Sequence, residues 1–204
     1  MSDTGAAQVL DSPWSGGRAP FDIGWQKLMM WIFIITDALL FAGLLVGYGV
    51  VRVASPEWPD QNIPFDMNFI TFMTFTLIAS SFAMACAVAA AKQGNKKHTQ
   101  MFVWLTIVGG LVFLGSQVYE WSHFIHEGAR LTSNPWGVAH FSASFFVITG
   151  FHGMHVTTGV IILICTAIRL AMGKTSAGGV ENAGLYWHFV DLVWVFVFAL
   201  FYLV

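Results

Sequence analysis

Charged residues are scarce in this sequence, and their scarcity excludes most soluble folds. They make up 10% of the chain, whereas a soluble domain carries about 25%. Hydrophobic residues make up 56%, with 19 Phe and 9 Trp among them, and the mean hydropathy is +0.68. The net charge of −2, with no basic cluster, also argues against a nucleic-acid partner. The composition therefore predicts an integral membrane protein.

The sequence has only two cysteines and none of the common catalytic motifs. Cys86 and Cys165 both lie inside apolar runs, so we interpret them as small hydrophobic residues and not as a disulfide or a metal-binding pair. The chain contains no GxSxG motif, no phosphate-binding loop and no CxxC motif. We therefore expect neither a catalytic residue nor a metal ligand in this chain.

Long apolar runs dominate the rest of the sequence. Each approaches or exceeds the roughly 20 residues that a helix needs to cross a bilayer. The runs cover residues 27–52, 67–91, 100–122, 140–171 and 185–204. The connections "SPEWPDQNIP", "KQGNKKH", "SNPWG" and "GKTSAGG" carry proline, glycine or charge, leave no room for a soluble domain, and show no internal repeat. The sequence predicts an all-α integral membrane fold, a five-transmembrane-helix bundle in residues 27–204.

Basic residues predict the orientation of this bundle. Residues 1–26 lack the short apolar core of a signal peptide, so we interpret them as a cytoplasmic N-terminal tail and the first helix as the insertion signal. The side of the membrane that holds this tail also holds seven of the nine Lys and Arg residues: Arg18, Lys27, Lys92, Lys96, Lys97, Arg169 and Lys174. The other side holds Arg52 and Arg130. The positive-inside rule then places the N-terminus in the cytoplasm and the C-terminus outside.

A carboxyl group lies in the middle of the first span. Asp37 follows Lys27 by ten residues, which is about 15 Å along a helix. An ionised carboxylate at that depth costs on the order of 2.5–3.5 kcal/mol, so its presence calls for a role. Asp37 could exchange protons or line a water-filled path, or it could join two helices by a hydrogen bond, which is the interpretation we prefer. On the same helix, Gly43 and Gly47 form a GxxxG pair that predicts close approach of another helix.

Glutamate and histidine recur near the outer end of the third span. Glu120 shares a helix face with Gln117, and His123 and His126 continue the pattern toward the loop. A metal site is one interpretation of this pattern. A polar network between helices is the one we favour, because these ligands thin out toward solvent and include no cysteine.

Two histidine-containing motifs lie in the last two spans. His152 and His155 are flanked by Gly150, Gly153 and Gly159, which predict close contact with another helix or subunit. Axial ligation of haem is the alternative. A di-haem bundle usually carries two histidines about 13–14 residues apart on a helix, and no pair here has that spacing.

The last span adds a histidine and an aspartate three residues apart. His188 and Asp191 therefore share one helix face, where they could satisfy each other or reach His152. We expect the inward-pointing polar residues to hold one bundle together: Asp37, Glu120, His152, His188 and Asp191. They do not form a nucleophile, base and oxyanion arrangement.

Four stretches of the sequence carry a family resemblance: "FIITDALLFAG" (33–43), "LGSQVYEW" (114–121), "TGFHGMHVTTG" (149–159) and "YWHFVDLVWVFVFALFYL" (186–203). In this order they resemble signature segments of subunit III of the haem-copper terminal oxidases. The resemblance runs from about Leu28 to the C-terminus. Glu181 lies where the family usually has a glutamate just before its last helix.

The chain departs from the common mitochondrial form of that family in two ways. That form has seven helices, so the first helix here corresponds to the family's third, and Asp37 replaces an intramembrane glutamate. Both features resemble short bacterial members, including those of quinol oxidases. The missing helices border the cleft in which longer members hold phospholipid, so phospholipid is only a candidate ligand here.

The resemblance implies an accessory role in a larger enzyme. Haem and copper would belong to subunits I and II, and this chain would bind none. It would pack mainly on subunit I, with subunit II, small subunits and membrane lipids as further partners and a respiratory supercomplex as a wider assembly. It would support proton uptake and the durability of the catalytic centre in the bacterial cell (inner) membrane, as a multi-pass protein. We favour cytochrome c over quinol as the electron donor of that enzyme.

A protein of another class is the main alternative. A freestanding proton-coupled transporter could use Asp37 and Glu120 as its exchanging carboxyls. Transporters often have repeated halves and helices broken by glycine or proline. Five unbroken spans without internal symmetry argue against that alternative.

Overall fold

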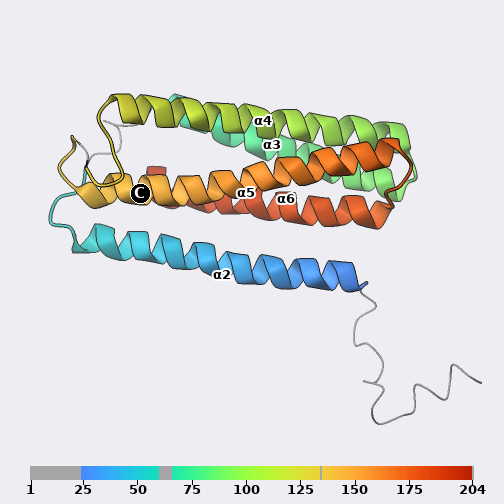
Figure 1. Cartoon of the computed structure of the whole chain (residues 1–204), viewed down its shortest axis with the longest axis horizontal. Helices are drawn as coiled ribbons and strands as arrows, with labels where there is room; N and C mark the ends of the chain where they lie inside the picture. Colours follow the sequence, from blue (N-terminus) through green and yellow to red (C-terminus); the bar gives the residue numbers. More distant parts are fainter. Residues whose placement is uncertain (1–23, 60–65, 134, 204) are drawn as a thin grey trace, which may run out of the picture.

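The computed structural model describes residues 24–59, 66–133 and 135–203. This part of the chain contains five long α-helices (Figure 1). They are α2 (Trp25–Ala54), α3 (Met67–Lys92), α4 (Lys96–His126), α5 (Ala139–Ala171) and α6 (Ala177–Val197), and α6 continues as the π-helix η1 (Phe198–Leu203). All five are long and apolar enough to cross a membrane. The prediction of an all-α fold with five spans is confirmed, while most of the predicted tail, residues 1–23, lies outside the described residues.

The first four predicted spans lie inside the observed helices, but the start predicted for the last span is wrong. Helix α6 begins at Ala177, within the stretch "GKTSAGG" that we expected to be a flexible connection. The Ser176 side chain accepts a hydrogen bond from the backbone N–H of Gly179, which caps this helix end. Two glycines in this stretch did not prevent the helix, because a good cap and the packing of the helix outweigh their low propensity.

Short connections at one end of the bundle depend on glycine. Gly94 ends α3 with a φ of +73°, and the backbone N–H of Asn95 donates to the carbonyl of Ala90. Gly173 ends α5 in the same way, with a φ of +70°. Left-handed backbone of this kind favours glycine and satisfies the last carbonyls of a helix. The basic residues gather at this end, which we call the basic end: Lys27, Lys92, Lys96, Lys97, Arg169 and Lys174.

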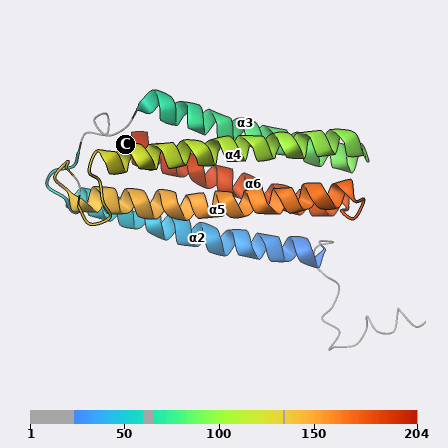
Figure 2. The same ribbon diagram turned by 45° about the horizontal axis from the view of Figure 1, so that its top comes forward.

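Helix α6 occupies the centre of the bundle. It packs against α3, α5 and α2, while α4 closes the other side through its contacts with α3 and α5. Helix α2 runs along the outside, against α6 and α5, and stands apart from α3 and α4 in both views (Figures 1 and 2). Little of α2 is buried inside the chain, so most of its surface is free to meet lipid or another protein.

Two tryptophans of α6 form the centre of the core. Trp187 and Trp194 are both almost completely buried, and each indole N–H donates to a hydroxyl of α3. The nitrogen of Trp187 lies 3.2 Å from Ser80 Oγ, and that of Trp194 lies 3.0 Å from Thr74 Oγ1. An indole N–H in the hydrocarbon region has no water to bond with, so these hydroxyls fix the rotation of α6 against α3.

Small residues make room for these rings. A Cβ added at Gly110 would lie 2.6 Å from the Trp187 ring, and one added at Gly159 would lie 2.9 Å from the same ring. Gly150 faces the ring of Trp121 at 3.0 Å, as a predicted contact position, and Gly153 has looser contacts. Sequence reasoning missed Gly110, whose own motif, "VGG", carried no polar neighbour to mark it.

The GxxxG pair of α2 has a different setting. Gly43 and Gly47 are exposed, and no described atom of the chain lies within 4 Å of a Cβ added to either one. The chain's own helices therefore do not use this pair for close packing. Among the described residues nothing packs on these glycines, so they are open to a helix of another molecule.

Substitution of Gly110 tests the packing around Trp187. Gly110→Ala should lower the free energy of unfolding by about 1–3 kcal/mol, because the added methyl group overlaps a ring that cannot move without breaking its bond to Ser80. Gly115→Ala on the same helix is the control, since a Cβ there meets nothing within 4 Å. Thermal unfolding of the detergent-solubilised chain measures both. Equal stability of the two variants would contradict the packing described here.

Candidate functional site

The polar residues predicted to hold the bundle together do not form one cluster. The structure places Asp37, Glu120, His188 and Asp191 in separate contacts between pairs of helices, while His152 has no polar partner among the described residues. This distribution suits a role in joining helices better than a single reaction centre, which needs its groups within reach of one substrate.

Asp37 of α2 meets His155 of α5. The distance between Asp37 Oδ2 and His155 Nε2 is 3.3 Å, and both side chains are about nine-tenths buried. The other ring nitrogen, Nδ1, lies 2.8 Å from the backbone carbonyl of Phe151, so it must carry a hydrogen. The contact between Nε2 and the carboxyl is then attractive only if a proton lies on one of the two atoms. Rings of Phe41 and Phe151 cover the pair.

His152, one turn away on α5, is surrounded by aromatic rings. It is completely buried between Phe113 of α4 and Trp194 of α6, with ring centroids 5.7 and 5.0 Å away. Neither of its ring nitrogens has a hydrogen-bond partner among the residues that the structure describes. Gln117 of α4 is also buried, and both atoms of its amide lack a partner within the same residues. Packing therefore places these two groups, in contrast to Asp37, which contacts His155.

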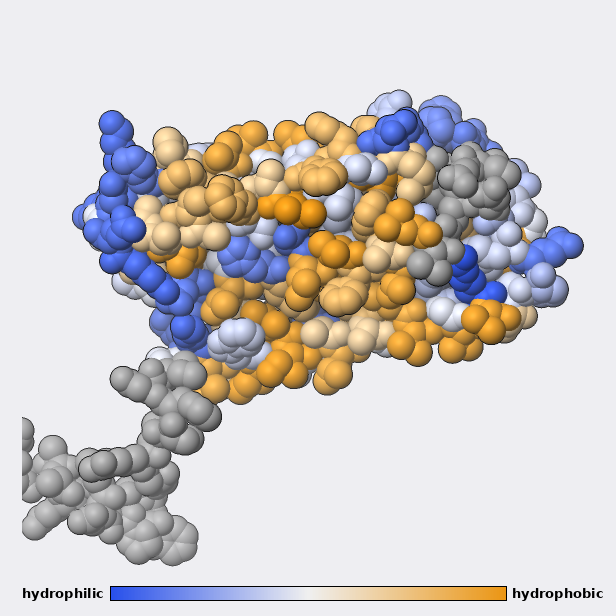
Figure 3. Space-filling model, turned by 180° about the vertical axis from the view of Figure 1, so that it is seen from behind, coloured by the Kyte–Doolittle hydropathy of each residue, from blue (hydrophilic) through white to orange (hydrophobic). Residues whose placement is uncertain are grey.

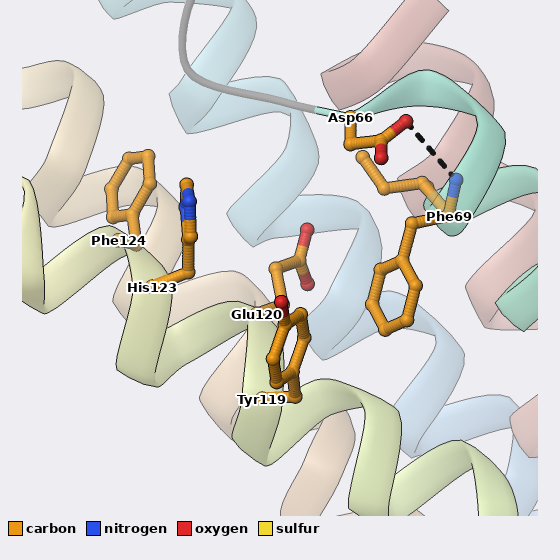
Figure 4. A pocket seen from close by; sticks show the side chains of 7 residues that line it. Asp66, Phe69, Tyr119, Glu120, His123 and Phe124 are labelled. Carbon is orange, nitrogen blue, oxygen red and sulfur yellow. Dashed lines mark hydrogen bonds between the residues drawn. The ribbon is translucent and has the colours of Figure 1, made fainter.

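Glu120 lies toward the far end of the bundle and is bound by the C-terminal π-helix. The hydroxyl of Tyr202 donates to Glu120, at 3.0 Å from Oε1 and 3.3 Å from Oε2. A cavity of about 160 Å³ lies beside this carboxyl and is also lined by Asp66 and His123 (Figure 4). The Asp66 carboxylate already caps α3 by accepting from the backbone N–H groups of Asn68 and Phe69, as the dashed line in Figure 4 shows for one of them.

The arrangement around Glu120 bears on the metal interpretation. Within the described ranges, no group of three histidine, cysteine, aspartate or glutamate side chains is placed to hold a metal ion. His123 lies 3.7 Å from Glu127 instead, on the exposed surface of α4. Tyr202 was missed by sequence reasoning, because a tyrosine at the end of an apolar helix resembles an interfacial residue.

His188 and Asp191 do not pair in the predicted way. We expected them to satisfy each other or to reach His152, but both turn to Ser81 of α3. His188 Nδ1 lies 2.7 Å from Ser81 Oγ, and the same hydroxyl bonds to the Asp191 carboxyl. The expected link to α5 is therefore wrong, and the link is to α3. The serine pair in "LIASSFAMA", inside an otherwise apolar span, was the available signal for this contact.

Glu181 joins three helices at the basic end. Its Oε1 accepts from Lys27 of α2 at 2.9 Å and from Lys92 of α3 at 3.2 Å. Glu181 itself belongs to the first turns of α6. The family resemblance drew attention to this glutamate, but neither lysine was predicted as its partner. The bridge ties the start of the outlying helix α2 to the centre of the bundle.

These features define a class of protein: a helical membrane protein whose polar residues connect its helices. Comparison with known proteins makes the class specific. Residues 11–204 match the model of the family described as cytochrome c oxidase subunit III. The chain therefore belongs to the cytochrome c oxidase subunit III family, as its four motifs predicted, and it is a multi-pass membrane protein.

Individual relatives come from both branches of the oxidases. The chain is 34% identical over 211 residues to cytochrome c oxidase subunit 3 of Synechocystis sp., across 100% of this chain and 87% of that protein. It is 35% identical over 181 residues to quinol oxidase subunit 3 of Bacillus spizizenii, across 86% of this chain and 85% of that protein. It is 32% identical over 185 residues to a probable quinol oxidase subunit 3 of Staphylococcus saprophyticus, across 88% of this chain and 89% of that protein. Both names thus occur among the relatives.

An amide substitution of Asp37 separates a structural role from proton exchange. Asparagine has the same size and can still bond to His155, so Asp37→Asn should assemble normally and change oxygen reduction by less than about twofold at any pH. Oxygen consumption of the purified oxidase between neutral and alkaline pH measures this. Asp37→Leu is the companion variant that removes the bond altogether and should lower the stability of the chain. Normal assembly of the Asn variant with a marked loss of turnover above neutral pH would show proton exchange instead.

Proposed function

We propose that this chain is the accessory subunit III of a proton-pumping haem-copper oxygen reductase. In this role it packs on subunit I and supports proton uptake and the stability of the catalytic centre, without redox centres of its own. The observation that carries the proposal is that the acidic side chains of the helices contact residues of other elements. Asp37, Glu120 and Glu181 each bind a residue of another helix or of the C-terminal π-helix, and no described cluster resembles a reaction centre.

The same proposal includes the orientation of the chain, its membrane and its partner subunits. The basic end faces the cytoplasm, as the positive-inside rule predicts from its lysines and arginines. The bacterial cell (inner) membrane is the location we propose, in keeping with the bacterial sources of the relatives. Subunit I is the main partner, subunit II and small subunits complete the enzyme, and phospholipid fills the remaining surface. Cytochrome c is the donor that we favour for this enzyme.

Purification of the tagged chain from its own membranes in mild detergent tests this function. Large subunits that carry haem and copper should co-purify with it in stoichiometric amounts, whereas the chain expressed alone should show no haem absorption, because His152 and His155 have no paired histidine at di-haem spacing. Haem spectroscopy and quantitative mass spectrometry read out both preparations. Purification of the chain from its native membrane without such subunits would overturn the proposal.

A further inference from the structure

One side of α6 is left open by the other helices. Helix α6 meets α2 through Phe189, which packs near Phe41, and it meets α3 through Trp187 and Trp194. At 100° per residue, the arc between these two contacts carries His188 and Asp191. It also carries three exposed apolar residues, Leu192, Val195 and Phe196. We call these five residues, together with Ser81 of α3, the open face of α6.

The open face is polar at its centre and apolar around it. Ser81, His188 and Asp191 are each partly exposed there. Figure 3 shows the side of the molecule on which α3 and α6 lie, with hydrophilic surface enclosed by hydrophobic surface partway along the helices. In water, such polar groups would be hydrated. On a surface that faces lipid they are destabilising, because lipid chains offer them no hydrogen-bond partner.

The depth of this patch decides what can cover it. Glu181 lies at the basic end, where it bonds to Lys27 and Lys92. Asp191 lies ten residues further along α6. Ten residues of helix span about 15 Å, which is half the thickness of a hydrocarbon core of about 30 Å. Lipid headgroups lie far from this level, and acyl chains have no hydrogen-bonding groups. A polar partner at mid-membrane therefore has to come from a protein helix.

The hydrogen bonds within the patch leave acceptors without donors. Ser81 has one hydroxyl hydrogen, which can serve either His188 or Asp191. The Nδ1–H of His188 can donate to Ser81 Oγ while the Ser81 hydroxyl donates to Asp191. These two hydrogen bonds use the hydroxyl hydrogen and leave Nε2 of His188 as an acceptor. Oδ1 of Asp191 also has no partner among the residues that the structure describes, but it is buried within the chain. A donor from outside can therefore reach only Nε2 of His188 and the partly exposed rest of the Asp191 side chain. The open face thus needs a donor from outside the chain.

We propose that the open face of α6 binds a transmembrane helix of the large oxidase subunit that brings a hydrogen-bond donor to His188 and Asp191 at mid-membrane. The proposal rests on the proposed function, which supplies the partner. A helix with a hydroxyl, amide or guanidinium group at this level would satisfy the acceptors, while Leu192, Val195 and Phe196 would pack against its apolar residues.

Photo-cross-linking in the intact oxidase tests where that helix lies. A photoreactive amino acid replaces Leu192, which is 55% exposed on the open face, and in a second variant it replaces Val118, which is 65% exposed on α4. Irradiation should cross-link the probe at 192 to a transmembrane segment of the large subunit at least about tenfold more than the probe at 118, because photoreactive groups capture only neighbouring atoms. Equal yields at the two positions, or capture of lipid alone at 192, would overturn the inference. In either case co-purification of the subunits would leave the proposed function standing.

Substitution in the patch gives a second, independent test. Asp191→Leu should reduce retention of the chain on the purified oxidase by about tenfold, since the partner's donor is then left unpaired in an apolar setting. Asp191→Asn keeps an acceptor oxygen and should be retained much better. Thr36→Val is the control, because it removes a hydroxyl from an exposed position of α2 that bonds only within its own helix in the described structure.

The isolated chain distinguishes docking from an internal role. On the proposal, Asp191→Leu weakens retention by about tenfold, while the isolated chain loses only the small stability that one hydrogen bond to Ser81 contributes. A loss of stability in the isolated chain that matches the loss of retention would show that Asp191 only joins α6 to α3, and the proposal would then be wrong. Undiminished retention of Asp191→Leu would contradict it as well.

Discussion

The absence of water from the hydrocarbon region is the constraint on which this structure depends. A hydrogen-bonding side chain within a span finds no partner in the hydrocarbon, so any partner must come from protein. His152 and Gln117 lack such a partner among the described residues, and packing alone places them. The indole nitrogens of Trp187 and Trp194 do bond to hydroxyls of Ser80 and Thr74, and these two bonds set the rotation of α6 against α3. With that rotation set, the ring of Trp187 lies on Gly110, which joins α4 to the same core.

The polar contacts then fall into two kinds with different consequences. Glu120 with Tyr202 and Asp37 with His155 are closed contacts between residues buried within the chain, the first a hydrogen bond and the second a 3.3 Å approach of Asp37 Oδ2 to His155 Nε2. The contact of His188 and Asp191 with Ser81 is open, because it lies partly exposed at mid-membrane. The closed contacts join α2 to α5 and α4 to the C-terminal π-helix. The open contact could be completed by a hydrogen-bond donor from another subunit, which would stabilise the chain within a larger complex.

Much of the fold could be predicted from the sequence, because a span is a local property. Hydrophobic length alone located all five helices, and only the start of α6 was misplaced, because its glycines resemble a loop until the Ser176 cap is recognised. Side-chain partners are a different matter. Which residue His188 meets depends on the rotation of α6 relative to α3, which packing sets over the whole length of both helices. Ser81 could be noticed in the sequence, but its partner could not be assigned.

Glycines show the same division between local and tertiary information. The GxxxG spacing of Gly43 and Gly47 is easily read, yet these residues face away from the chain's other helices. Gly110 carries no comparable signature, yet it makes one of the tightest approaches in the core. A spacing motif indicates that close packing is possible on a helix face. Only the arrangement of the neighbouring helices determines whether that face lies inside the chain.

A structure of the complete oxidase in a lipid bilayer, detailed enough to place side chains, is the most direct test. It shows whether His188 and Asp191 face lipid or another subunit. We predict that a donor atom of the large subunit lies within about 3 Å of His188 or Asp191, while Asp37 and His155 stay paired within the chain. An acyl chain covering His188 and Asp191, with no protein donor in reach of either, would contradict this prediction.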